Sequence, residues 1–444
     1  MFHRVVFCHV LRCFYDGDKS WSIMPELRTI ILAAGKGQRF RSEKPKVLHQ
    51  LAGKPVLHYV LDVAQALGSL RTYVVAGHKA ELVAKSVGDR ATVVLQKEQL
   101  GTAHAVRCCA QHFSHVKGEV LVMCGDTPLL DKAVIRRLVA AHRRNGNAAT
   151  VLTTQLEDAS GYGRVIRDAG GKFAAIREHK DCAADELKVR EINTGVYCFD
   201  ASKLFASIHE IKQNAKKKEF YLTDIIELFL AQGGKVGAFL SDDWTANLGL
   251  NTRAELAQAE QIRRAKVIGR LMAGGVTIVD PATTYIEDDV VIGQDTVIYP
   301  CTYIHTGVRI GRDCSVGPFA RLRPGTKLGR GVCIGNFAEV SRSVLGDGAM
   351  MKHFSFLGDA EVGAGANIGA GAVTANYDGK NKNKTKIGKR AFIGCDAVLV
   401  APVSVGDGAV AGAGSVVTPS RGIPAGMVGV GVPARVIKKA IKHE

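Results

Sequence analysis

The sequence lacks the cysteine spacings that reveal a disulfide framework or a zinc site. Its 11 cysteines among 444 residues form no C-x-x-C pair and no zinc-finger pattern. Cysteines without such spacing are typical of reduced thiols in the cytoplasm. We therefore expect a cytoplasmic protein without structural disulfides.

A long uninterrupted hydrophobic run is also missing. The N-terminal stretch 1–23 is partly apolar, but Arg4, His9 and Arg12 interrupt it and no small-residue cleavage site follows. This pattern argues against both a signal peptide and a membrane span. Because Met24 directly precedes the first strand pattern, we interpret residues 1–26 as a leader or a misassigned start.

Aromatic residues are few, at 6% of the chain, and they do not alternate with basic ones. The formal net charge is nevertheless +17, with 59 basic and 42 acidic residues. Basic residues spread along a chain without such alternation do not indicate a nucleic-acid-binding surface. We expect no nucleic-acid partner and favour an enzyme whose small-molecule substrates are polyanions.

The chain is long enough for two domains. From 27 to 250, short β-branched runs alternate with helical stretches, as at 29–32, 56–67, 72–75, 120–123 and 133–144. Strands separated by such helices predict βαβ units and a mostly parallel, Rossmann-like sheet, with ligands at the carboxyl ends of its strands. Residues 251–275 then predict one polar linker helix.

A six-residue repeat dominates residues 276–444, where many of the 49 glycines lie. An aliphatic residue followed by glycine recurs, often six residues or a multiple of six apart, as at 292–293, 310–311, 316–317, 334–335, 362–363, 368–369, 387–388 and 393–394. Three hexapeptides make one triangular coil of roughly 18 residues, so the pattern predicts a parallel β-helix in which the small residue turns the corner. Such coils resemble the left-handed hexapeptide-repeat acyltransferases, which implies a left-handed helix and a homotrimer.

A glycine-rich loop over 32–46 directly follows the first predicted strand. Small residues such as Ala34 and Gly35 let backbone N–H groups approach a phosphate chain, while Arg39 and Lys46 supply countercharge. With the strand before it and Pro45 and Lys46 after it, the segment resembles the signature of sugar-nucleotide pyrophosphorylases.

The resemblance narrows over 95–105, which is similar to the uracil-reading segment of bacterial N-acetylglucosamine-1-phosphate uridyltransferases. The side-chain amide of Gln96 can match the edge of uracil, and Gly101 leaves room for the ring. Five companion motifs lie at 124–128, 161–164, 178–181, 191–195 and 250–251. Together with the order of the domains, they resemble the bifunctional GlmU family of uridyltransferases and N-acetyltransferases over nearly all of the chain after Met24.

The resemblance implies Mg²⁺-dependent uridylyl transfer from UTP to N-acetylglucosamine-1-phosphate, giving pyrophosphate and the cell-wall precursor UDP-N-acetylglucosamine. It implies phosphate contacts from Arg39 and Lys46, nucleotide contacts from Leu32, Ala34, Gly35, Lys46, Gln96, Gly101 and Thr102, sugar contacts from Gly163, Glu178 and Asn193, and metal contacts from Asp126 and Asn251. Positioning and charge neutralisation would provide most of the rate, because the attacking phosphate is already ionised.

The repeat domain resembles the family's acetyltransferase, which acetylates glucosamine-1-phosphate with acetyl-CoA. The resemblance implies that His353 is the general base and that Glu339 orients it. It further implies that Arg323 and Lys382 grip the sugar phosphate, that Asn367 contacts the sugar, and that Asn376 and Tyr377 lie near the acetyl group.

The chain departs from the family pattern at five positions. Gln38, Phe40 and Cys124 stand where threonine, methionine and tyrosine are usual, and Ser341 and Phe356 replace a phosphate-gripping lysine and a sugar-contacting tyrosine. Three interpretations therefore stay open: a bifunctional enzyme, a uridyltransferase whose β-helix only trimerises it, and a non-catalytic regulatory relative. Intact Asp126, Asn251 and Lys46 argue against the last.

Overall fold

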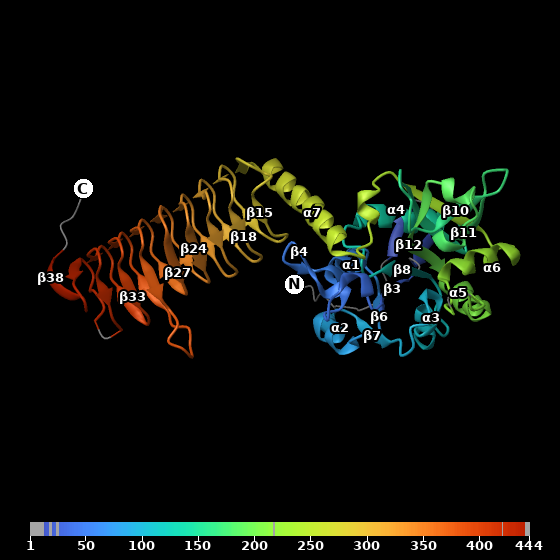
Figure 1. Ribbon diagram of the computed structural model, residues 1–444, viewed down its shortest axis with the longest axis horizontal. Coiled ribbons are helices and arrows are strands. Elements are labelled where there is room, and N and C mark those ends of the chain that lie inside the picture. Colours follow the sequence, from blue (N-terminus) through green and yellow to red (C-terminus); the bar gives the residue numbers. More distant parts are fainter. Residues whose placement is uncertain (1–12, 17–19, 24–25, 216–217, 420, 440–444) are drawn as a thin grey trace, which may run out of the picture. The chain divides into compact units, whose positions relative to one another are not determined.

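The computed structural model describes residues 13–16, 20–23, 26–215, 218–419 and 421–439 (Figure 1). It divides into two compact units, Met1–Ala259 and Glu260–Glu444, so that the division falls within helix α7 (Arg253–Ala273). The leader expected over 1–26 lies mostly outside the described residues, apart from the antiparallel pair β1 (Cys13–Asp16) and β2 (Ser20–Ile23). In the described part of the chain, no helix has the length and apolar character needed to cross a membrane.

A nine-stranded sheet forms the centre of the first unit. Its strands are β3 (Leu27–Ala33), β6 (Arg71–Ala76), β7 (Thr92–Leu95), β8 (Glu119–Cys124), β9 (Ala149–Gln155), β10 (Arg164–Arg167), β11 (Phe173–Arg177), β12 (Glu191–Asp200) and β13 (Val236–Ser241). Strands β7, β6, β3 and β8 are neighbours in that order and parallel, whereas β12 joins β8 antiparallel. The Rossmann-like sheet expected from the alternating pattern is confirmed. A short hairpin of β4 (Gln50–Leu51) and β5 (Lys54–Pro55) lies outside it.

Helices cover both faces of this sheet. Helices α1 (Val56–Ala66), α2 (Ala80–Val87) and α4 (Lys132–Asn145) share one buried cluster with Ile31 of β3. Helices α3 (Thr102–Arg107), α5 (Ala201–Ser207) and α6 (Ile225–Ala231) share another with Ile30. Successive side chains of a strand point to opposite faces. An apolar run such as that of β3 is therefore suited to burial on both sides.

The second unit consists of three sheets in which parallel strands of two to four residues stack coil upon coil, followed at the end of one sheet by a longer antiparallel strand (Figure 1). One face holds β14 (Thr277–Ile278), β17 (Val297–Ile298), β20 (Ser315–Val316), β23 (Cys333–Ile334), β26 (Met350–Met351), β29 (Asn367–Ile368), β32 (Phe392–Ile393), β35 (Val410–Ala411), β37 (Met427–Val430) and the antiparallel β38 (Arg435–Lys439). The next holds β15 (Tyr285–Ile286), β18 (Tyr303–Ile304), β21 (Arg321–Leu322), β24 (Ala338–Ser341), β27 (Ser355–Gly358), β30 (Val373–Ala375), β33 (Val398–Val400) and β36 (Val416–Val417). The third holds β16 (Val291–Ile292), β19 (Arg309–Ile310), β22 (Lys327–Leu328), β25 (Val344–Leu345), β28 (Ala360–Val362), β31 (Thr385–Ile387) and β34 (Val403–Val405). This is the predicted left-handed β-helix.

The repeated aliphatic residues fill the interior of the coils. Ile298, Val316 and Ile334 are fully buried on one face. Val316 and Ile334 are each followed by a glycine, and at Gly335 the reason is not the corner that the pattern predicted: a Cβ there would lie 1.8 Å from the carbonyl oxygen of Lys352 in the next coil. The close stacking of successive coils therefore excludes a side chain there.

The coils are not all of one length. Arg321 pairs with Glu339 18 residues later, but Glu339 pairs with Phe356 only 17 residues later. Ala360 pairs with Thr385, because an insertion in this coil forms a loop closed by a bridge between Tyr377 and Lys382. Most of the residues predicted for acetyl transfer belong to these irregular coils.

Candidate functional site

The loops after parallel strands β3, β7 and β8 come together at one edge of the first unit's sheet. They carry the glycine-rich segment after Ala33, Gln96 directly after Leu95, and Asp126 two residues after Cys124. Beside them lies a cavity of about 750 Å³ lined by Lys36, Gly37, Gln38, Arg39, Lys46, Lys97, Glu98, Gln99, Glu219 and Asn251. This edge is where parallel α/β sheets bind ligands.

Three predicted residues meet at this edge. Lys46 Nζ donates to Asp126 Oδ2 at 2.5 Å and to Asn251 Oδ1 at 3.2 Å. The backbone joins the last two as well, because Leu250 N donates to the carbonyl oxygen of Asp126 at 2.9 Å. The structure thus brings Lys46 to the two residues that the sequence assigned to the metal.

The same arrangement tests whether a divalent cation fits. The oxygens of Asp126 and Asn251 converge on one positive charge, the ammonium group of Lys46. One carboxylate and one amide oxygen are the hard donors that Mg²⁺ accepts, with its other ligands coming from phosphate and water. These residues therefore fit a magnesium ion.

The start of helix α7 holds Asn251 in place. Glu255 Oε2 accepts the backbone N–H groups of Asn251 and Thr252, while the backbone N–H of Glu255 donates to Thr252 Oγ1 at 3.1 Å. This is a reciprocal capping box. Sequence reasoning missed its link to the site, although Thr252 followed three residues later by Glu255 is the recognisable signal.

Within the glycine-rich loop, the structural demand for glycine falls on Gly37. Its φ is +60°, and a Cβ there would lie 2.9 Å from Lys46 Cβ. A Cβ added at Gly35 would meet no atom within 4 Å. Ala34 is buried and Leu32 half-buried, whereas Gly35 and Arg39 are exposed. Gly37 thus lets the loop pass close to Lys46, leaving Arg39 accessible at the cavity.

The segment proposed to read the base is tightly packed. Gly101 has a φ of +99°, and a Cβ there would lie 2.6 Å from the carbonyl oxygen of Phe220, so the chain itself demands this glycine. Thr102 Oγ1 accepts the backbone N–H of Leu222 at 2.9 Å. Gln96 is only 3% exposed, and its Nε2 donates to the carbonyl oxygen of Gly101 at 3.1 Å and to His104 Nδ1 at 3.0 Å. Sequence reasoning gave His104 no role.

Two of the three predicted sugar contacts are joined directly. The backbone N–H of Asn193 donates to the carbonyl oxygen of Gly163 at 2.9 Å, and Asn193 Nδ2 donates to Tyr197 Oη at 2.6 Å. Burial raises the pKa of Glu178, and Thr223 Oγ1 donates to its carboxylate at 3.4 Å. Burial and then the charge of Glu178 raise the pKa of the Tyr197 hydroxyl, to which Asn193 donates.

The departures in this unit mostly avoid the cavity. Phe40 is buried, its ring 4.9 Å from that of His49 and 5.2 Å below the guanidinium of Arg253. Burial raises the pKa of the Cys124 thiol to about 12, and the thiol donates to the carbonyl oxygen of Gly195 at 3.6 Å. Only Gln38 lines the cavity itself.

In the second unit, Arg323 Nη1 donates to Glu339 Oε1 at 2.9 Å. His353 is exposed, and within the part of the chain that the structure describes its side chain has no hydrogen-bond or ion-pair partner. The orientation of His353 by Glu339 therefore stays a prediction. Asn367 is half-buried on β29.

The inserted loop carries three further predicted residues, two of which, Asn376 and Lys382, act on Asp359. Asn376 Nδ2 donates to Asp359 Oδ2 at 2.5 Å. Lys382 pairs across the loop with Tyr377, which is 61% exposed and donates through its hydroxyl to the carbonyl oxygen of Gly379. Lys382 also helps to lower the pKa of Asp359.

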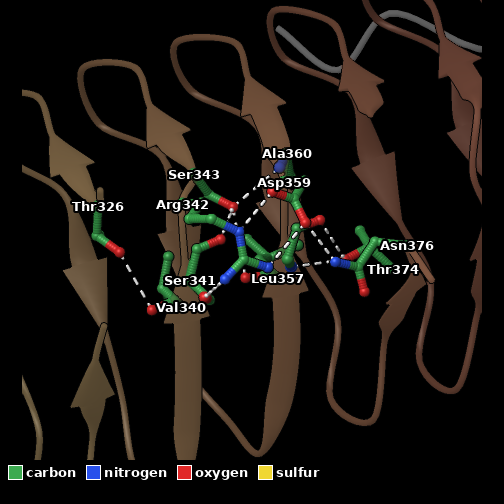
Figure 2. A network of polar contacts seen from close by, with 11 residues as sticks. Thr326, Val340, Ser341, Arg342, Ser343, Leu357, Asp359, Ala360, Thr374 and Asn376 are labelled. Atoms are coloured by element: carbon green, nitrogen blue, oxygen red, sulfur yellow. Dashed lines mark hydrogen bonds and ion pairs between the residues drawn. The ribbon is translucent and has the colours of Figure 1, made fainter. Parts of the chain in front are cut away.

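Arg342, rather than the residue at 341, carries the basic group at the end of β24 (Figure 2). Its Nε and Nη2 donate to Asp359 Oδ1 and Oδ2 at 2.7 and 2.9 Å, and its Nη1 donates to Ser341 Oγ at 2.8 Å. This hydrogen-bonded pair is the main reason why the pKa of Asp359 is lowered. Ser341 is fully buried, whereas the Arg342 side chain is 36% exposed. A cation therefore remains accessible beside Ser341.

Comparison with known families agrees with this arrangement. Residues 29–224 match the MobA-like NTP transferase domain, residues 307–342 match the bacterial transferase hexapeptide, and residues 284–318 and 384–419 match the hexapeptide repeat of succinyl-transferase. The chain thus combines a nucleotidyltransferase domain with an acyltransferase-type repeat domain.

Full-length relatives make the assignment specific. Proteins named "Bifunctional protein GlmU" from Shouchella clausii and Geobacillus thermodenitrificans are each 42% identical, over 88% and 89% of this chain and 93% and 94% of theirs. The one from Pelotomaculum thermopropionicum is 44% identical over 85% of this chain and 90% of its own. The chain belongs to the GlmU family.

Proposed function

We propose that this protein transfers a uridylyl group from UTP to N-acetylglucosamine-1-phosphate, forming UDP-N-acetylglucosamine and pyrophosphate. The observation that carries the proposal is the convergence of Lys46, Asp126 and Asn251 beside the glycine-rich loop. Family membership and intact nucleotide, sugar and metal motifs support it.

In the proposed reaction, an oxygen of the sugar phosphate attacks the α-phosphorus of UTP in line, and the bond to the pyrophosphate leaving group breaks. Magnesium, held by Asp126 and Asn251, would neutralise charge on the phosphates. Lys46 and Arg39 stabilise the negative charge that develops around phosphorus. Gln96 holds the base, and Glu178 and Asn193 hold the acetamido sugar, so that the reacting atoms stay aligned.

For the second unit we propose acetyl transfer from acetyl-CoA to the amine of glucosamine-1-phosphate. His353 would take the proton of the attacking amine, and Arg323, Arg342 and Lys382 would hold the phosphate. Arg342 replaces the missing lysine at 341: each of its terminal nitrogens keeps one N–H beyond those bonded to Ser341 and Asp359. His353 is exposed and has no hydrogen-bond or ion-pair partner among the described residues, which suits a site that a neighbouring subunit of a homotrimer completes. Both activities would belong to the cytoplasm, as the absence of disulfide spacing among the cysteines predicts.

Purified full-length protein tests both proposals separately. We expect Mg²⁺-dependent pyrophosphate release from UTP with N-acetylglucosamine-1-phosphate, and release of free CoA from acetyl-CoA with glucosamine-1-phosphate. Pyrophosphate without CoA would leave a uridyltransferase with a scaffolding β-helix. If the protein forms neither pyrophosphate nor free CoA, the result would favour the regulatory interpretation.

A further inference from the structure

The hydrogen bonds of the buried Gln96 amide determine which of its two ends is free. The carbonyl oxygen of Gly101, 3.1 Å away, can only accept, so the atom facing it must be the donor Nε2. The second N–H of Nε2 is directed to His104 Nδ1 at 3.0 Å. His104 must then be neutral with its proton on Nε2, because Nδ1 accepts. Oε1 of Gln96 has no partner among the described residues.

This orientation is supported by a rigid frame. Gln96 donates its backbone N–H to the carbonyl oxygen of Ala76 at 2.8 Å. The backbone of Phe220 hydrogen-bonds to Leu100 and Ala103 on either side of Gly101, at 2.8 and 2.9 Å. Because Gly101 cannot move, rotating the amide would set two acceptors against each other and leave His104 Nδ1 without its donor. The protein therefore fixes the amide from two directions.

We propose that His104 is a positioning residue: by engaging the second N–H of Gln96, it makes the amide present only an acceptor to the base. The inference rests on the proposed uridylyl transfer and deepens it. An acceptor at this position pairs with a pyrimidine that carries a proton on N3, as uracil and thymine do. Cytosine presents an unprotonated N3 acceptor, so Oε1 would face a second acceptor and lose its hydrogen bond with water.

Without His104, the second N–H of Gln96 is released and can itself be offered to a base as a donor, while Gly101 still holds the first. The expected result is relaxed discrimination between bases with the chemical step retained, because among the described residues the His104 side chain hydrogen-bonds to Gln96 and to none of the residues proposed to bind phosphate. For His104→Leu we expect the KM for UTP to rise about fivefold, the size of one neutral hydrogen bond, with kcat little changed. The ratio of kcat/KM for UTP to that for CTP should fall about tenfold, because CTP gains while UTP loses.

Asparagine provides the rescue. Its Oδ1 lies near the position of histidine Nδ1 and can accept the same N–H, so His104→Asn should keep the preference for UTP. His209→Leu, at an exposed histidine of the same unit, is the matched control and should change neither KM nor the preference. If the His104→Leu variant has a lower melting temperature than the natural protein, His104→Ser replaces it in the experiment. The serine hydroxyl is too short to reach Gln96.

The experiment measures turnover with N-acetylglucosamine-1-phosphate and, in parallel, binding of UTP and CTP to the full-length chain. A leucine or serine variant that keeps the natural preference for UTP overturns the inference while leaving the uridyltransferase intact. An asparagine variant as indiscriminate as leucine also overturns it, because the acceptor would then not matter. Natural protein that turns over neither nucleotide refutes the proposed function, and the binding preferences still decide the role of His104.

Discussion

The two candidate sites differ in how far along the chain their charged side chains find partners. Lys46 binds Asp126, 80 residues away, and Asn251, 205 residues away, with the side chains of Lys46 and Asp126 only 13% and 22% exposed. In the β-helix, Arg323 pairs with Glu339 and Arg342 with Asp359, each about one coil away, and the two arginine side chains are 41% and 36% exposed. The first site is thus assembled by the folding of one chain. The second lies on the outside of a repetitive scaffold, and its predicted base, His353, has no partner in the part of the chain that the structure describes.

The largest effect is expected from core substitutions that test whether the two units unfold separately. Leu121 in β8 and Leu322 in β21 are both fully buried, in different clusters. Leu121→Ala and Leu322→Ala should each lower the free energy of unfolding of their own unit by about 2–5 kcal/mol. Both tryptophans, Trp21 and Trp244, belong to the first unit. The unfolding transition followed by tryptophan fluorescence should therefore shift only for Leu121→Ala. The transition followed by circular dichroism should shift for both variants. A fluorescence shift with Leu322→Ala would show that the units unfold together.

The next test removes the charge at the first site. Asp126→Asn keeps an oxygen but loses the carboxylate that pairs with Lys46, so uridylyl transfer at saturating substrate should fall at least about a hundredfold. CoA release by the second unit should be unchanged. Asp89→Asn, at an exposed aspartate of the same unit, is the control. Near-normal pyrophosphate release by Asp126→Asn would exclude this carboxylate from the reaction.

Acid should affect the first unit through His142. Burial lowers the pKa of this histidine from 6.5 to about 4, so the unfolded chain binds more protons between these values. The free energy of unfolding should therefore fall as the pH drops from about 6.5 to 4, by about 3 kcal/mol. Tryptophan-detected denaturation should show a smaller fall in His142→Gln. An unchanged slope would assign the acid sensitivity to other groups.

The smallest effect concerns the displaced cation of the second site. Arg342→Ala should raise the KM for glucosamine-1-phosphate about tenfold with kcat little changed, because a charge-assisted contact to phosphate is lost. Adding Ser341→Lys should recover the lower KM. Arg390→Ala, an exposed arginine of the same unit, is the control. If Arg342→Ala leaves the KM unchanged, the guanidinium only binds Asp359.

Much of the fold was predictable because it depends on local periodicity. The helices predicted at 56–67 and 133–144 are found at Val56–Ala66 and Lys132–Asn145. The aliphatic-glycine repeat predicted the β-helix, although the reason for the glycines differs, since stacked coils exclude a Cβ. The positions of the motifs at strand ends were also foreseeable, because parallel strands place their carboxyl ends at one edge of the sheet.

What the sequence by itself determined is the order of strands, helices and coils, and which residue types stand at their ends. Local stereochemistry sets these features within a few residues. Only the tertiary structure decided which side chains meet: Lys46 with Asn251, His104 with the Gln96 amide, and Arg342 with Asp359 beside the uncharged Ser341. Such partnerships depend on how long loops close and how coils align. A shift of one residue along the chain, as from 341 to 342, can therefore move a charge without removing it.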